Sequence, residues 1–425
     1  MRSLALLLAA AALVAGCVSA DEASSCSTDN PDYPDCLPDD DGGKADNANA
    51  ARAQMNDLTI VVPLAASQAE LDAGYLKASD GGTTPLLPKK LYTDLFPDPT
   101  GPLNPGADVK MRYANLRVVA VRFDPCFANV GPVVDASTCD NQIRLVFQSL
   151  DYADGATAVD GAVHAFYRVP RAELTQIIQD VITLRKANGQ TTAMGPLAPH
   201  PLLVKQGLDG AFGKGLRAII LAHASSKNLI RFTHFESANL QTVWNFSGFD
   251  ISGTTTQTAK PMVIPTMPSH GTGAGFFQGF AAPMAGGFTP ESTSADSISL
   301  LVNATKAKAA TKTKQKAAYA AALRIENPNF HSPNTIDCAS CHLAQPARLL
   351  VGDDVLGLSA TDNPNLFARD AKYVSARSMK QTTSLRDQPL NVHMLSYRGD
   401  QLMIGQRVIN ETAALVAYLN STVFN

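Results

Sequence analysis

The sequence predicts a multidomain α+β protein in which a β-rich N-terminal domain precedes an all-α C-terminal domain. Short stretches of alternating apolar and polar residues recur between residues 55 and 300, as in β-strands. From residue 301 an Ala- and Lys-rich stretch without Gly or Pro predicts a helix. Residues 406–420 have the apolar spacing of another helix.

Length and composition fit a globular protein outside the nucleic-acid-binding classes. The chain has 425 residues, enough for two or three domains, and 45% of them are apolar. Its net charge of −3 argues against nucleic-acid binding. We expect four segments: a leader (1–16), an acidic tether (17–54), a β-rich domain of unknown role (55–300) and a helical domain (301–425).

Residues 1–16 have the composition of a secretory leader. Arg2 precedes a Leu- and Ala-rich run that is too short to cross a bilayer as a helix. The run ends in Val14-Ala15-Gly16-Cys17, which resembles the lipobox of bacterial lipoproteins. The resemblance implies cleavage before Cys17 and a lipid on its thiol. The alternative is an ordinary signal peptide, cleaved near residues 18–20 with loss of Cys17.

The lipoprotein resemblance implies a place in the bacterial cell envelope, anchored by acyl chains. Val18, rather than an aspartate, follows the cysteine, which favours the outer membrane, facing the periplasm or the cell surface. The acidic segment 17–54 has few large apolar residues, so we expect a disordered tether. We expect a disulfide between Cys26 and Cys36, since disulfides persist outside the cytoplasm. The aspartates are an alternative calcium site.

The region 55–300 predicts a β-sandwich or an open sheet with one or two helices. Residues 115–123 and 142–150 are expected to be neighbouring antiparallel strands, with a disulfide between Cys126 and Cys139 just beyond their ends. An apolar stripe predicts a helix over 171–185. The other expected elements are strands at 57–63, 163–169, 229–235, 242–251 and 261–265, a helix at 215–224, and a long loop at 271–288.

Nothing in this β-rich region identifies a chemistry. Its histidines are scattered along the sequence and form no close metal-ligand pair. His164 and His234 lie inside expected strands, where a core or surface role is the favoured interpretation. The histidines of the region are His164, His200, His223, His234 and His270.

The run Cys338-Ala339-Ser340-Cys341-His342 is the pattern that attaches a c-type haem. Two thiols on one helical turn can each bond a porphyrin vinyl group, and the next residue brings an imidazole to the iron. Three alternatives share the motif: a thioredoxin-like redox pair, a structural zinc site and a plain disulfide. The upstream prolines and the lack of a second Cys pair nearby disfavour the first two.

Residues from about 300 to 425 resemble a class I cytochrome c. The features of the resemblance are the helical stretch 301–323, the Cys338–His342 motif and the closing helix 406–420. It implies one haem c, with Cys338 and Cys341 as thioether links and His342 as the proximal axial ligand.

The resemblance also implies a distal ligand, usually a methionine before the last helix. Met394 has the best spacing, and His393 and Met379 are its main rivals. Met403, His331 and an open position also remain as alternatives.

The expected function is that of a membrane-tethered, extracytoplasmic c-type cytochrome that transfers single electrons to or from a redox partner protein. Lys308, Lys312 and Lys316 form a basic stripe that is either a docking face for that partner or an ordinary solvated helix face. Two alternatives belong to other classes. One is a haem enzyme of the peroxidase or oxidase kind, and the other is a surface ligand-binding lipoprotein with a subsidiary haem domain.

Overall fold

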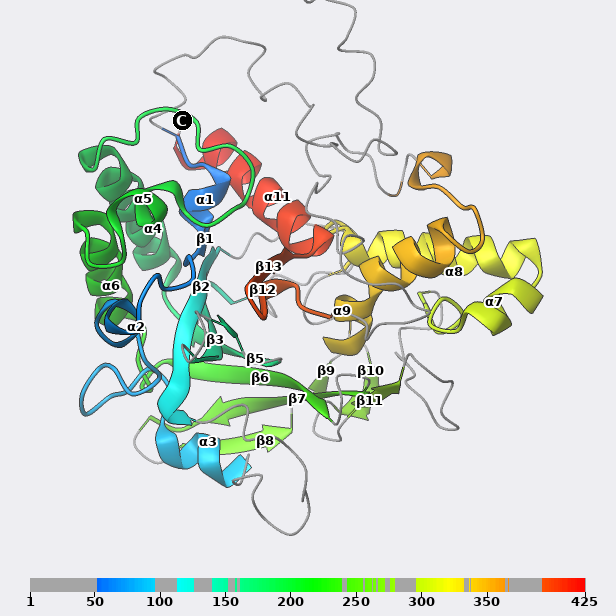
Figure 1. Ribbon diagram of the computed structural model, residues 1–425, viewed down its shortest axis with the longest axis horizontal. Coiled ribbons are helices and arrows are strands. Elements are labelled where there is room, and N and C mark those ends of the chain that lie inside the picture. The colour runs from blue at the N-terminus through cyan, green and yellow to red at the C-terminus, as the bar shows by residue number, and fades with distance from the viewer. Residues whose placement is uncertain are drawn as a thin grey trace, which may run out of the picture.

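The computed structural model describes most of the chain after residue 51, as a mixture of helices and antiparallel sheet (Figure 1). The predicted leader, residues 17–51 of the predicted tether and the predicted disulfides lie outside this part of the chain. The tether prediction is wrong for residues 52–54, because Ala53 is buried and its backbone exchanges two hydrogen bonds with the Asn420 side chain. The described residues are 52–95, 113–125, 140–151, 157–158, 161–238, 243–254, 257–261, 263–264, 267–271, 276–279, 296–331, 336, 338–363, 366 and 392–424.

A nine-stranded antiparallel sheet is the centre of the described fold. Its order is β1-β2-β3-β5-β6-β7-β11, with β4 paired to β3 and β8 to β7. Nearly every residue of β2 is buried, so this strand packs on both faces. The strands are β1 (Thr59–Val61), β2 (Leu116–Asp124), β3 (Gln142–Asp151), β4 (Thr157–Ala158), β5 (Gly161–Arg168), β6 (Leu229–Ala238), β7 (Val243–Ser252), β8 (Thr258–Pro261) and β11 (Phe276–Gly279).

The main strand predictions are confirmed. β2 and β3 pair antiparallel as expected, with Asp124 opposite Gln142 at their facing ends. The predicted loop 271–288 is wrong over residues 276–279, because Phe276 to Gly279 form β11 and pair with β7. The expected strand 57–63 is only partly right, since the helix α1 (Met55–Leu58) covers its beginning. The short pair β9 (Val263–Ile264) and β10 (Met267–Gly271) forms a separate two-stranded sheet.

Helices cover the sheet on one side through α4 (Arg171–Ala187) and α6 (Ala211–His223), with the short α5 (Pro201–Gln206) beside them. The α4 stripe is buried as predicted, through Leu174, Ile177, Ile178 and Val181. The helices α2 (Gln68–Gly74) and α3 (Lys89–Leu95) were not predicted from the sequence.

The C-terminal region contains the predicted helices, but one of them is split into two. The expected helix 301–323 is two helices, α7 (Ala304–Ala309) and α8 (Lys312–Glu326), because Thr311 caps α8 through the Lys314 amide. The motif opens α9 (Cys338–Ala347), which continues into a π-helical segment, η5 (Arg348–Asp353). A short 3-10 turn, η6 (Ala360–Asp362), follows. The closing helix is α11 (Gln406–Thr422), as expected.

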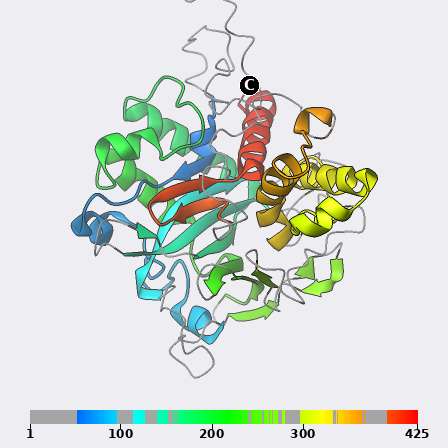
Figure 2. The same cartoon turned by 45° about the vertical axis from the view of Figure 1, so that its right-hand side comes forward.

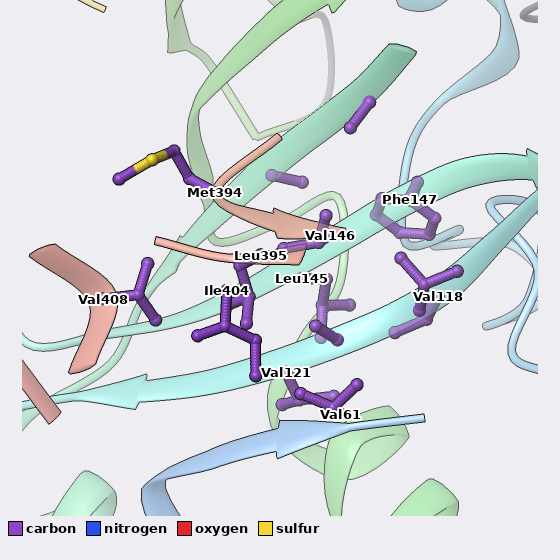
Figure 3. Close-up of a cluster of buried hydrophobic side chains, with 14 of the residues drawn as sticks. Val61, Val118, Val121, Leu145, Val146, Phe147, Met394, Leu395, Ile404 and Val408 are labelled. Atoms are coloured by element: carbon purple, nitrogen blue, oxygen red, sulfur yellow. The ribbon is translucent and has the colours of Figure 1, made fainter. Parts of the chain in front are cut away.

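A separate all-α domain is not confirmed. The C-terminal region includes a β-hairpin of β12 (Leu395–Arg398) and β13 (Gln401–Ile404), which lies beside the large sheet (Figure 2). Figure 3 shows Leu395 and Ile404 of this hairpin packed with Val121, Leu145 and other apolar side chains of β2 and β3. Sheet and C-terminal region therefore share one hydrophobic core.

Buried polar contacts fix the hairpin on the sheet. The side-chain amide of Gln148, on β3, donates to the Tyr397 carbonyl at 2.8 Å and accepts from the Tyr397 amide at 2.7 Å. It also donates to the Gly161 carbonyl at 2.9 Å.

A second buried polar contact joins the sheet to the last helix. Thr59 of β1 and Thr412 of α11 share a hydroxyl hydrogen bond of 2.7 Å. No described helix is long and apolar enough to cross a membrane.

Replacing Gln148 by Leu should destabilise the protein by about 2 kcal/mol or more, because both backbone polar groups of buried Tyr397 lose their partner. Chemical denaturation measures this change. The matched control is Gln176→Leu on the exposed face of α4, for which we expect a change within about 0.5 kcal/mol. Equal effects of the two substitutions would contradict the role of Gln148.

Candidate functional site

A cavity lies between one face of the sheet and the C-terminal region, and the Cys338–His342 motif opens onto it. Its volume is about 120 Å³, which is smaller than the roughly 300–1,000 Å³ of most ligand pockets. The residues that line it come from β2, β3, β5, β6, β7, α9, β12 and α11 and their ends. The cavity is thus built jointly by sheet and C-terminal region.

The wall of the cavity that the sheet forms carries a row of side chains from residues that are paired across neighbouring strands. Arg122 on β2 lies opposite Arg144 on β3, Arg144 opposite Phe166 on β5, and Phe166 opposite Arg231 on β6. Directly opposed residues of an antiparallel pair project from the same face. One row of the sheet therefore brings three arginines to this face.

The neighbouring row brings a histidine. His164 on β5 lies opposite Val146 on β3 and Thr233 on β6. It is the one partly exposed residue between Gly161 and Tyr167, and that exposure is toward the cavity it lines. Burial, together with the charges of Arg144 and His342, holds the pKa of His164 well below its ordinary value. The imidazole is therefore neutral at physiological pH, with a lone pair available to a metal.

Helix α9 presents the motif as the sequence predicts. Cys338 and Cys341 are three positions apart in α9, both partly exposed, both lining the cavity, and not joined by a disulfide. His342 follows and lines the same cavity. Two thiols and an imidazole from one helical turn thus converge on one space, which is the arrangement that covalent haem attachment requires.

The tautomer of His342 is set by its neighbour. Its Nδ1 lies 2.6 Å from the carbonyl oxygen of Val392, so Nδ1 carries the proton and donates. Nε2 is then the unprotonated nitrogen that can ligate a metal, and a backbone hydrogen bond of this kind orients ligating histidines. Burial lowers the pKa of His342 to about 4, against the opposing effect of that hydrogen bond.

Aromatic rings surround His342. The ring centres of Phe235 and Phe246 lie 5.1 and 5.3 Å from its own, and both phenylalanines line the cavity. The ring of His164 is 6.4 Å away, at an interplanar angle of 46°. The cavity therefore has apolar aromatic walls next to the imidazole and polar groups beyond them.

The predicted distal ligands occupy different positions. Met394 is buried and lines the cavity, with the tip of its side chain against Gly405. His393 is fully buried beside Phe235 and makes a 2.6 Å hydrogen bond through Nδ1 to the Ser396 hydroxyl, and it does not line the cavity. Met379 lies outside the described residues.

The remaining alternatives are engaged elsewhere. Met403 is buried on β13, opposite Ser396. His331 is bonded through Nε2 to Asp296 at 2.7 Å. Neither lines the cavity. Of the distal candidates that the sequence offers and the structure describes, only Met394 is beside the motif in the cavity.

An ion-pair network crosses the cavity wall from the sheet to α11. Glu411 accepts from Arg122 at 2.9 Å and pairs with Arg407 at 2.5 Å. Asp124 pairs with Arg122 and with Arg144, each at 3.0 Å. Burial raises the pKa of Glu411, but the three arginines outweigh it and lower the pKa to about 2. The carboxylate is charged in the folded protein above that pH.

The residues fit a covalently bound haem. Cys338, Cys341 and His342 supply the two attachment thiols and an axial imidazole, and the aromatic walls suit an apolar macrocycle. Each of the four lining arginines already pairs with a carboxylate, which is Glu411, Asp124 or Asp250. Among the described residues, no three His, Cys, Asp or Glu side chains are grouped to hold a metal ion directly.

Searches against protein-family models, curated proteins and solved structures found no match to this chain.

The sequence interpretation did not single out His164 or the arginines of the sheet. His164 was assigned a core or surface role, since no other chemistry-bearing residue is near it in sequence. The signal in the sequence is that each expected strand carries one member of the row: Arg122, Arg144, Phe166 and Arg231. These side chains can be recognised as one row only when the strand order and register are known. Two other histidines of the region have local roles: His200 caps α5 and His223 pairs with Glu173 at 2.6 Å. His234 lines the cavity.

Acid should weaken the fold through Glu411. Its folded pKa is depressed from 4.5 to about 2, so its contribution to stability is present above pH 4.5 and is lost as the pH falls toward 2. The loss is about 3 kcal/mol by linkage. Denaturation at a series of pH values measures it, and Glu411→Gln should flatten the dependence in this window. The control is Asp362→Asn, which alters an exposed carboxylate and should leave the dependence of stability on pH unchanged. The prediction would be contradicted if the stability of Glu411→Gln fell with pH in parallel with that of the unaltered protein.

Proposed function

We propose that this chain is a membrane-tethered, extracytoplasmic c-type cytochrome that carries one covalently bound haem and transfers single electrons. The observation that carries the proposal is the convergence of Cys338, Cys341 and His342 on one cavity. When bound there, the haem would supply a one-electron couple between ferric and ferrous iron. The chain itself would hold the group by two thioether bonds and orient it through the hydrogen bond from His342 to Val392.

The surroundings of the motif support haem over a thiol redox pair. A thioredoxin-like Cys-x-x-Cys follows a strand in a βαβ unit, whereas the element before α9 is the helix α8. Burial keeps His342 neutral, as a ligand must be. The motif therefore has the setting of a cofactor site.

Electron exchange with a partner needs an accessible approach. Lys308, Lys312 and Lys316 of α7 and α8 are exposed and remain candidates for a basic docking face. The lipobox resemblance supplies the tether, through Cys17 and the acidic segment 17–54. A tethered carrier of this kind would exchange electrons with partners at the envelope.

A second candidate is a haem enzyme of the peroxidase or oxidase kind. It is favoured by one observation: the cavity beside His342 contains the polar side chains of His164 and Arg144, which are suited to bind a small polar substrate. An oxidised protein that is high-spin and whose absorption spectrum responds to peroxide or cyanide would support this enzyme over the carrier.

Covalent haem attachment is tested by replacing both cysteines with alanine. In a host that makes c-type cytochromes, the unaltered chain should retain haem through denaturing electrophoresis and acid–acetone extraction, and Cys338→Ala/Cys341→Ala should retain none. The matched control is Ser340→Ala, within the same turn. Loss of haem from the unaltered chain on extraction would contradict the proposal.

The lipid anchor is tested separately at Cys17. Cys17→Ser should release the haem protein from the membrane fraction into the soluble extracytoplasmic fraction, because the acyl chains are its proposed attachment. Fractionation with haem staining measures the change, and Ser19→Ala is the control. Equal membrane association of the two variants would contradict the anchor.

A further inference from the structure

We infer that His164, on strand β5 of the sheet, is the second axial ligand of the haem iron. The inference rests on the proposed haem at Cys338 and Cys341 and replaces the methionine expected from the sequence. Sheet and C-terminal region would then each supply one axial ligand, and the cofactor would bridge them.

The separation of the two imidazoles fits a shared metal. Metal–nitrogen bonds of about 2 Å, and ring nitrogens about 1.1 Å from the ring centre, place two opposed imidazole centres about 6 Å apart. The centres of His164 and His342 are 6.4 Å apart. Both rings line the same cavity.

The His164 ring is available to a ligand. Among the described residues, no hydrogen bond holds its ring nitrogens, and its side chain is partly exposed into the cavity. His393, by comparison, is fully buried and bonded to Ser396. His164 is also rigidly placed, because β5 is paired on both sides by β3 and β6.

Met394 is less well placed for the opposite side of the iron. The carbonyl of Val392 binds Nδ1 of His342 and thus lies behind the imidazole, on the side away from Nε2. Met394 is only two residues farther along the chain. Its thioether would have to pass around the porphyrin edge to bind from the other face, whereas it packs against Gly405.

The test uses the full haem-loaded chain and reads the spin state of the ferric protein by electron paramagnetic resonance. The unaltered protein should be low-spin. His164→Ala should convert most of the ferric haem to a high-spin form, and added imidazole should restore the low-spin signal by entering the vacated position. The matched control is Met394→Leu, a volume-conserving change that should leave the signal low-spin.

A second readout needs no variant, so it does not depend on whether a variant folds. Near-infrared magnetic circular dichroism of the unaltered ferric protein reports the two axial ligands, and two nitrogen ligands are expected.

A third readout is the reduction potential. His164→Met should raise it, since a thioether favours ferrous iron relative to an imidazole.

The outcomes separate the inference from the proposed function. Covalent haem with a nitrogen–sulfur pair, a low-spin His164→Ala protein, or a high-spin unaltered protein would overturn the role of His164 while the haem proposal stood. Absence of covalent haem from the unaltered chain would remove both.

Discussion

The pairing of Arg122 with Glu411 is the interaction on which the site depends, because it joins the sheet to α11 at the cavity wall. The side chain of Arg122 is 2% exposed and that of Glu411 15%. Removing one partner of a buried ion pair costs about 3–5 kcal/mol where the other charge is left unpaired, and Arg122 has a second carboxylate partner in Asp124 at 3.0 Å. Arg407 extends the link from Glu411 to the backbone carbonyls of Ile325 and His331. One carboxylate thus holds β2, α11 and the end of α8 together.

The site formed across this junction gives the β-rich region a role. In the sequence it has no chemistry of its own, but in the fold its strands form one wall of the space that the motif enters. The environment would set the reduction potential through opposing effects. In the proposed cytochrome, the arginines of the wall, offset in part by Asp124, Asp250 and Glu411, would favour the form with one more electron. A second imidazole in place of a thioether would lower the potential. The sheet would thereby tune the proposed haem of the C-terminal region.

Local patterns in the sequence predicted local structure well. The strands β2 and β3, the stripe of α4, the motif at the start of α9 and the helix α11 follow from periodicity and helix signals that act over a few residues. The β12–β13 hairpin was missed although a signal exists: Gly399-Asp400 is a two-residue turn between extended segments, and Gly399 has the positive φ, 59°, that such turns need.

The site was only half predictable for a physical reason. The thiols and His342 are adjacent in sequence, so helix geometry alone brings them together. His164 meets His342 through strand register and the docking of α9 on the sheet, and the arginines join the cavity in the same way. No local pattern encodes a contact that depends on tertiary packing. The single core shared by sheet and C-terminal region was hidden from the sequence for the same reason.

The most direct test of the proposed haem between the sheet and the C-terminal region is an anomalous difference map at the iron absorption edge, from crystals of the haem-loaded full chain. We expect one iron peak in the cavity, next to Nε2 of His342 and on the side of β5. A peak outside this cavity, or Cys338 and Cys341 joined to each other without iron, would contradict it.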